Sequence, residues 1–322
     1  MRHLHRAYGL NISSNRHVPY LTESDDAASV DVLVVFHDID PSEVISAGDG
    51  WGFGFPTSNG PLVGVDVFDR PKQHKLRFYH PAGEFLEFVV SAGTVDVFVP
   101  DGIAQGDAVS FLIGPVLAVV CRMRQIPCLH ASVLTIDDRA FALMGGKGAG
   151  KSTTAAMLRT MGAGLLTDDV AVMHRGGDGH ISVQPGYPHM RLTHDAARIC
   201  HRSFSQDSLV LSTGAKCYVP AYSDDVASRF PTGPVHLDRV YLLSTREPAI
   251  ECSIETVDHA QALRELNRHA YVRYVTNESI RKKDFELFAD LARLGSVRAT
   301  NRPDDLAMLE LFCEQLLQEF AG

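Results

Sequence analysis

The chain is predicted to be a mixed α/β protein in which a larger α/β domain follows a smaller β-rich domain. Three observations predict this class. Short β-branched and aromatic runs separated by turns fill the N-terminal third, and a glycine-rich loop at 145–152 lies between a strand-like and a helix-like run. Apolar residues recur at spacings of three and four toward the C-terminus. We place the two domains at residues 1–105 and 106–322.

The N-terminal part contains four strand-like runs, 31–36, 75–79, 84–90 and 94–99. Gly, Pro and Asp turns separate these runs, which is typical of an antiparallel sheet. No catalytic constellation stands out before residue 106. This domain is therefore interpreted either as a structural or oligomerisation module, so that the chain could form a homo-oligomer, or as a surface for substrate recognition.

The C-terminal part alternates between helical and strand-like patterns. A helix is expected near 108–125, followed by a strand at 129–136, a hairpin turn at 137–139 and a second strand at 140–144. Further strands are expected at 170–173, 180–183, 216–219 and 239–243. Helices are expected at 154–159, 258–268, 281–293 and 304–319.

Composition excludes several function classes. The formal net charge is −9, so broad electrostatic attraction to nucleic acid is not expected. The apolar run 111–120 is shorter than a membrane span, and the N-terminus lacks the apolar core of a signal peptide. Six cysteines are scattered without a C-x-x-C pair, which indicates a reducing compartment rather than a disulfide frame. We therefore expect a cytoplasmic protein without membrane contact.

The loop at 145–152 reads Gly-Gly-Lys-Gly-Ala-Gly-Lys-Ser, the G-x-x-x-x-G-K-[ST] pattern of a phosphate-binding loop. Glycines let consecutive backbone N–H groups point at phosphate oxygens, and the following helix N-terminus adds a favourable dipole. The pattern predicts binding of a nucleoside triphosphate, with ATP as the expected donor and Mg²⁺ as its metal. The residues expected to hold it are Gly145, Gly146, Lys147, Gly148, Ala149, Gly150, Lys151, Ser152 and Thr153.

Two further features lie near this loop in sequence. Asp168 and Asp169 follow a short apolar run just beyond the loop's helix, and phosphoryl transfer needs carboxylates to hold Mg²⁺ or to accept a proton. Adjacent strand residues point to opposite faces, so both can serve one site only if the backbone bends there. His130 is expected on a strand beside the loop strand, although a lone histidine is more often a surface or core residue.

Together these elements resemble a known kinase domain. The segments 129–133, 145–152 and 165–170 are similar to the HPr kinase/phosphorylase superfamily, which shares its broad fold group with the phosphoenolpyruvate carboxykinases. The similarity covers about residues 126–175. The stretches 186–192, 216–220 and 262–269 resemble HPr-kinase-like proteins of lasso-peptide maturation clusters, and those relatives phosphorylate a serine at the C-terminus of a precursor peptide.

The resemblance implies roles for individual residues. Lys151 and Ser152 would hold phosphates and Mg²⁺, and Asp168 and Asp169 would supply a base and a metal contact. His130 would support the base. We assign Asp168 as the base and Asp169, with Ser152, to the metal. Cations are also needed where charge develops during transfer, and the candidates for phosphate or substrate contact are Arg191, Lys216, Arg268 and His269.

One departure narrows the expected substrate. True HPr kinases carry an E-x-R-G-x-G signature after the aspartate pair, whereas residues 183–189 here read Val-Gln-Pro-Gly-Tyr-Pro-His. The phosphocarrier protein is therefore not the expected substrate, and the reverse reaction is unsupported. The prediction is an ATP-dependent serine kinase acting on a peptide or protein partner. The alternatives are a small-molecule hydroxyl kinase, a nucleotide-gated NTPase and a non-catalytic nucleotide sensor.

Overall fold

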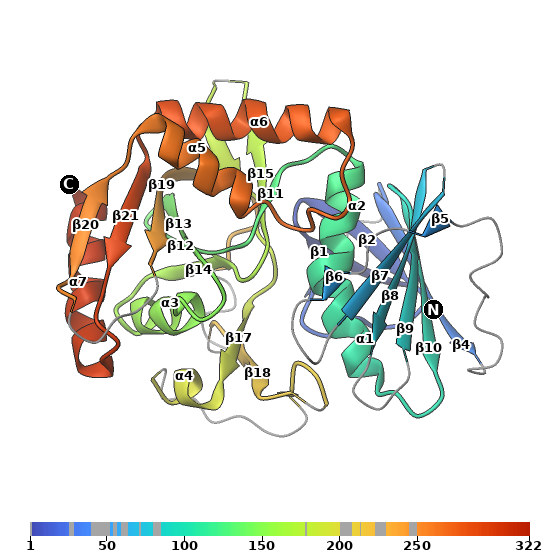
Figure 1. Ribbon diagram of the computed structural model, residues 1–322. Helices are drawn as coiled ribbons and strands as arrows, with labels where there is room; N and C mark the ends of the chain where they lie inside the picture. The colour runs from blue at the N-terminus through green and yellow to red at the C-terminus, as the bar shows by residue number, and fades with distance from the viewer. Residues whose placement is uncertain are drawn as a thin grey trace.

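The computed structural model describes residues 2–25, 29–39, 52–53, 57–58, 64–70, 72–79, 85–177, 179–199, 208–212, 214–222, 230–244 and 250–322. Two large sheets lie on either side of one long helix, and the remaining helices gather around the second sheet (Figure 1). The predicted mixed α/β class agrees with this arrangement. The division at residue 105 stays a prediction.

The first sheet contains ten described strands in the order β3-β1-β2-β4-β10-β9-β8-β7-β5, with β6 beside β7. Their bounds are β1 His3–Ala7, β2 Leu10–Ser14, β3 Thr22–Glu23, β4 Val32–Ile39, β5 Gly52–Phe53, β6 Thr57–Ser58, β7 Gly64–Arg70, β8 Gln73–Tyr79, β9 Phe85–Val90 and β10 Thr94–Pro100. The prediction of an antiparallel sheet was wrong for its centre, because β4 pairs in parallel with both β2 and β10.

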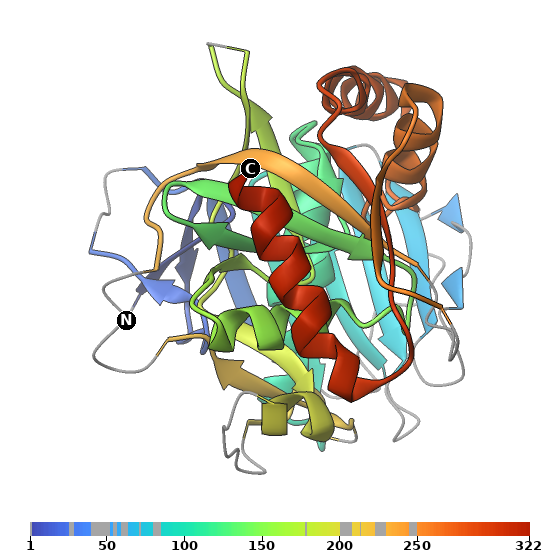
Figure 2. The same cartoon turned by 90° about the vertical axis from the view of Figure 1, so that its left-hand side faces the viewer.

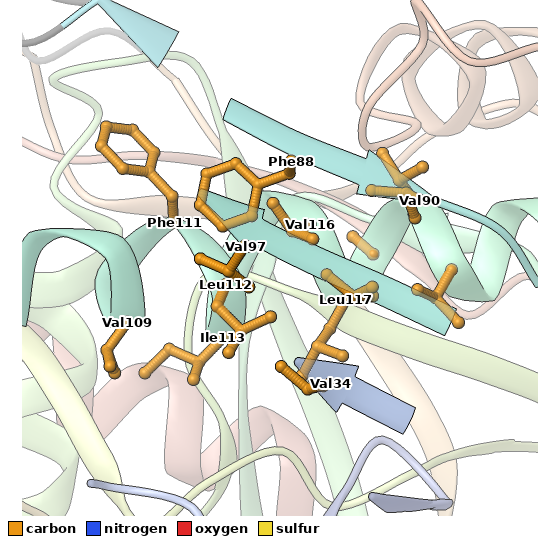
Figure 3. Packing of buried hydrophobic residues seen from close by; sticks show 14 of the residues in the cluster. Val34, Phe88, Val90, Val97, Val109, Phe111, Leu112, Ile113, Val116 and Leu117 are labelled. Atoms are coloured by element: carbon orange, nitrogen blue, oxygen red, sulfur yellow. The ribbon is translucent and has the colours of Figure 1, made fainter. Parts of the chain in front are cut away.

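The long helix packs against this sheet. It runs through α1 (Gln105–Phe111), a π-helical turn η2 (Leu112–Val116) and α2 (Leu117–Met123), as the sequence predicted for 108–125. Figure 3 shows apolar side chains of the helix and of β4, β9 and β10 in one buried cluster. Among the described residues, this 19-residue helix alone has the length and composition of a membrane span, but 83% of its apolar window is buried within the protein. That burial is typical of a core helix.

The second sheet carries the glycine-rich loop. Its order is β11-β15-β16-β19-β13-β12-β14, with β21 also paired to β19 and β20 paired to β21. The strands are β11 Cys128–Leu129, β12 Ala131–Ile136, β13 Arg139–Gly145, β14 Gly164–Thr167, β15 Ala171–Arg175, β16 Ile181–Val183, β19 Val235–Leu243, β20 Ser253–Thr256 and β21 Val297–Asn301. The predicted hairpin between β12 and β13 is confirmed, and β13 pairs in parallel with β19.

Helices cover both faces of the second sheet. Leu134, Phe141 and Leu143 share a core with α3 (Lys151–Thr160) and α7 (Leu309–Ala321), which follows the 3₁₀ turn η5 (Leu306–Met308). Alternate residues of the same strands, including Val133 and Ala142, share a core with α5 (His259–Arg268) and α6 (Glu278–Arg293). Figure 2 shows α7 lying across the face opposite to α5 and α6. The four helices correspond to predicted ones.

A small hairpin completes the wall of the candidate site. Strand β17 (His189–Thr193) pairs antiparallel with β18 (Lys216–Pro220), and the short helix α4 (His194–Ile199) follows β17 directly. In Figure 1 this hairpin lies beyond α3, below the second sheet. The predicted strand at 216–219 is confirmed, whereas β17 and α4 were not predicted.

Candidate active site at the phosphate-binding loop

The loop has the backbone geometry that its glycines permit. Strand β13 ends at Gly145 and helix α3 begins at Lys151. Gly148 and Gly150 adopt φ values of 86° and 91°, a left-handed conformation that only glycine accepts without strain. At Gly145 an added Cβ would lie 2.7 Å from the backbone oxygen of Leu243. Glycine is therefore needed there for the close approach of β19.

Lys151 lies folded over the loop that precedes it. Its Nζ donates hydrogen bonds to the carbonyl oxygens of Gly145, at 2.7 Å, and Gly146, at 3.4 Å. Burial lowers the pKa of this amine, Asp169 and Asp168 act in the opposite direction, and Lys216 lowers it further. The ammonium group thus lies at the N-terminal end of α3, where backbone N–H groups attract anions.

Asp168 is buried, and both of its carboxylate oxygens accept hydrogen bonds from the protein. The side chain of Ser132 on β12 donates to Oδ1 at 2.6 Å, and the backbone N–H of Arg191 on β17 donates to Oδ2 at 2.9 Å. Only 2% of the residue is exposed. Asp168 therefore joins β12, the end of β14 and β17 at one point.

Asp169 has different partners. Its Oδ1 lies 3.1 Å from Nδ1 of His130, and its Oδ2 accepts from Nη1 of Arg191 at 3.3 Å and from the Tyr271 hydroxyl at 3.2 Å. Burial by itself would raise the pKa of this carboxyl. The charge and hydrogen bond of His130, then Arg191 and Lys216, instead hold the pKa well below its ordinary value. Asp169 is consequently ionised at neutral pH.

His130 lies in the break between β11 and β12, where one backbone contact and two ring contacts hold it. Its backbone N–H donates to the carbonyl of His269 at 2.9 Å. Its ring stacks on Tyr271 with centroids 5.4 Å apart and an interplanar angle of 13°. Nδ1 also lies 3.1 Å from the carbonyl oxygen of Asp169. The stacking and the Nδ1 contacts direct the Nδ1 edge of the imidazole toward the aspartate.

The loop borders two cavities. The larger, about 990 Å³, brings together the loop, both aspartates and His130, and its lining includes Lys151, Ser152, Thr153, Asp168, Asp169, Arg191, Lys216 and His269. The smaller, about 540 Å³, lies between the loop, α5 and the ends of β19 and β21, and its lining includes Leu243, Gln261, Glu265, Arg268, Asn301 and Asp304. Gly145, Gly146, Lys147, Gly148 and His269 line both cavities.

The four residues predicted to contact phosphate or substrate lie in different parts of the site. Arg191 and Lys216 line the larger cavity, but the guanidinium of Arg191 is mostly buried and bound by protein acceptors. His269 lines both cavities, and burial lowers its pKa. Arg268 lines only the smaller one of these two, with 73% of its side chain exposed. Its role at the transferring phosphate thus lacks support from this geometry.

Two residues of the site were missed by the sequence reasoning. Ser132 holds Asp168, and Tyr271 holds Asp169. Ser132 could have been found, because it lies two residues after His130 on a predicted strand and so shares its face. Tyr271 gives no local signal, since it meets the site only through the return of the chain after α5.

The donor set fits a magnesium ion bound together with phosphates. Mg²⁺ prefers oxygen ligands and takes one or two carboxylates along with phosphate oxygens and waters. The hydroxyl of Ser152 and the ionised carboxylate of Asp169 line the same cavity and supply such oxygens. The described part of the chain contains no cluster of three or more His, Cys, Asp or Glu side chains suited to a metal.

Comparison with known proteins adds little to this geometry. No family model matches the chain, and no curated protein is similar to it. Among solved structures, it is similar to the HPr(Ser) kinase/phosphatase from Coxiella burnetii, with 13% sequence identity and a TM-score of 0.29. The match covers 61% of this chain and 99% of the other. With a sequence identity and a TM-score this low, the similarity supports no functional conclusion for this chain.

Proposed function

We propose that the protein is an ATP-dependent kinase of the HPr kinase type, which transfers the γ-phosphoryl group to a hydroxyl, expected to be a serine of a peptide or protein. One observation supports this most: Lys151 of the phosphate-binding loop and the ionised carboxylate of Asp169 line a single cavity. Phosphoryl transfer needs little more from a protein than positioning and charge stabilisation. This cavity supplies groups for both.

The phosphates would lie on the loop. Backbone N–H groups of the loop and the start of α3 would bind phosphate oxygens, and Lys151 would exchange its carbonyl partners Gly145 and Gly146 for them. Ser152 and Asp169 would hold Mg²⁺. When bound, Mg²⁺ neutralises charge that develops on the transferring group. The nucleoside would extend into the smaller cavity, where Gln261 and Asn301 offer amide groups to a base or ribose.

Asp169, rather than Asp168, is the carboxylate that we assign to the acceptor hydroxyl. Both carboxylates accept hydrogen bonds from the protein, but only 2% of Asp168 is exposed, whereas 25% of the Asp169 side chain is exposed. Asp169 is ionised and therefore able to orient the hydroxyl and accept its proton, with His130 fixing its direction. A low pKa makes it a weak base. That suffices when the transition state is loose and proton transfer comes late.

Mass spectrometry tests the proposal. The protein is incubated with MgATP and a peptide ending in serine, alongside Lys151→Ala, Asp169→Asn and, as a control, Lys282→Ala on the exposed face of α6. A gain of about 80 Da per phosphate, lost in the first two variants and kept in the third, would support the kinase. ATP binding without phosphoryl transfer to the peptide would direct the assay to small molecules that carry a hydroxyl group. Absence of ATP binding to the unmodified protein would overturn the proposal.

A further inference from the structure

The guanidinium of Arg191 is shared between the site and the long helix. Nη1 donates to Oδ2 of Asp169 at 3.3 Å, and Nη2 donates to the carbonyl oxygen of Ser110 at 2.8 Å. Tyr218 and Tyr187 approach the group as aromatic partners, 5.5 Å and 5.9 Å from ring centroid to Cζ. Only 11% of the side chain is exposed. The terminal N–H groups of Arg191 that would bind a phosphate thus already donate to protein oxygens.

The helix has a local irregularity where it meets this guanidinium. An added Cβ at Gly114 would lie 3.0 Å from both Nη1 and Nη2, so a side chain there would displace the group. Gly114 belongs to the π-helical turn Leu112–Val116, which also contains Pro115. Pro115 has no N–H to donate within the helix. A carbonyl oxygen has two lone pairs, and the carbonyl of Ser110 accepts a hydrogen bond from Arg191.

The first sheet fixes this part of the helix. Val109, Leu112 and Leu117 are fully buried in the core that the helix shares with β4, β9 and β10 (Figure 3). Tyr8, in the turn between β1 and β2, donates its hydroxyl hydrogen to the carbonyl of Ile113 at 2.8 Å. Its backbone N–H donates to the carbonyl of Pro185 at 2.7 Å, just before β17. Tyr8 therefore fixes the position of the long helix relative to the β17–β18 hairpin, on either side of Arg191.

We infer that Arg191 is a positioning residue, which holds the Asp169 carboxylate for transfer and is itself set in place by the π-helical turn around Gly114. The inference rests on the proposed kinase function. It replaces the expectation that Arg191 contacts phosphate or substrate. It also gives the N-terminal sheet a part in the site, because that sheet fixes the turn.

Two glycines of the same helix provide a matched test. Gly114→Ala would force the guanidinium to shift by a few tenths of an ångström from its place beside the turn, whereas Gly106→Ala lies in open space with nothing within 4 Å of the added Cβ. We expect Gly114→Ala to lower kcat about tenfold with the Kd for ATP changed less than about twofold, and Gly106→Ala to change neither. Arg191→Lys should retain more activity than Arg191→Gln. A rise in the Kd for ATP in both Arg191 variants would instead make Arg191 a phosphate ligand.

Combination with Asp169→Asn completes the test. If Arg191 and Gly114 act through Asp169, Gly114→Ala should cause no further loss of kcat in the Asp169→Asn background. Multiplied losses would overturn the inference. A second cycle, Arg191→Lys with Asp169→Asn, is measured by urea unfolding and needs no catalysis. Its effects should be non-additive, and additive effects would refute the contact. The two proposals can also fail separately. If the wild-type protein transfers no phosphate but the unfolding cycle is non-additive, the kinase function is refuted and the contact between Arg191 and Asp169 is supported.

Discussion

Asp168 and Asp169 are adjacent in sequence, yet their carboxylates bind separate sets of donors within one cavity, because Asp169 adopts a left-handed φ of 73°. The bend turns Asp168 toward Ser132 and the backbone of Arg191, and Asp169 toward His130, Tyr271 and the Arg191 guanidinium. A non-glycine residue in this conformation is uncommon, although aspartate tolerates it better than most. The strain lies at the point where two acids must face the same site.

The two acids are expected to differ when each is replaced by its amide. Asp169→Asn should reduce phosphoryl transfer by a factor on the order of 10² to 10³, because it removes the charge at the reacting group. Asp168→Asn should lower the free energy of unfolding by about 1–3 kcal/mol, because one of its buried donors loses a carboxylate acceptor. Kinetics and urea unfolding of both variants check this. Equal kinetic losses with unchanged stability would contradict the division of roles.

Neighbouring glycines of the loop should respond oppositely to alanine. At Gly145 the new Cβ would meet the backbone of Leu243, which cannot move without shifting β19. Gly145→Ala should therefore lower the free energy of unfolding by about 1–3 kcal/mol. Gly146 has open space around the same position, so Gly146→Ala should retain wild-type stability. Thermal unfolding of the pair distinguishes a packing requirement from general loop sensitivity.

Tyr271 is expected to contribute through its hydroxyl as well as its ring. Tyr271→Phe would keep the stack on His130 but remove the hydrogen bond to Asp169, which should cost about 0.5–1.5 kcal/mol, in stability or in kcat. Tyr274→Phe, in the same core cluster, is the control. Steady-state kinetics and unfolding of both variants measure the difference. Loss of activity in Tyr274→Phe alone would contradict this role.

Acid should destabilise the fold through two histidines, the buried His5 and the half-buried His189. Burial lowers the pKa of His5 to about 4, with His17 and His3 lowering it and Glu23 raising it, and burial lowers the pKa of His189 to about 4. Nε2 of His5 accepts a hydrogen bond from the Val18 backbone, so protonation would break that contact. Both pKa values lie below the unfolded value of about 6.5. Their stabilisation is complete above that pH and is lost as the pH falls toward 4.

Urea unfolding at several pH values between 7 and 4 measures this loss. Each histidine contributes at most on the order of 3 kcal/mol over the interval. His5→Gln should flatten the pH dependence of the free energy of unfolding relative to the wild type. An exposed histidine, His259→Gln, serves as the control and should leave the slope unchanged. A slope unaffected by His5→Gln would show that other groups govern acid unfolding.

Elements with local signals could be predicted from sequence, and those fixed by distant pairing could not. Helices α5 and α6 begin after Asp258 and Asn277, whose side chains accept from backbone N–H groups inside the first turn. Strand β21, Val-Arg-Ala-Thr-Asn, has little strand character of its own and forms because it pairs in parallel with β19. The parallel position of β4 likewise depends on β2 and β10, and no pattern within β4 reveals it.

The same distinction applies to the site. The loop and the aspartate pair could be predicted because each is a motif of consecutive residues with a recognisable chemical role. The two aspartates can face one site only if the backbone bends between them, and the left-handed φ of Asp169 provides that bend. The role of Arg191 could not be predicted, because its second acceptor is a main-chain carbonyl on a helix 81 residues earlier in the chain. No side-chain type marks such an acceptor.

The long helix Gln105–Met123 also determines whether the protein can be cut into two fragments that fold separately. A fragment beginning at residue 106 would keep the helix but lose the sheet that covers Val109, Leu112, Val116 and Leu117, leaving an apolar stripe in water. A fragment ending at 105 would leave the sheet's inner face equally bare. Neither half has a complete interior, so the two should melt together in one cooperative transition. Truncation at this boundary would therefore report on aggregation, and point substitutions are the way to separate the contributions of the two halves.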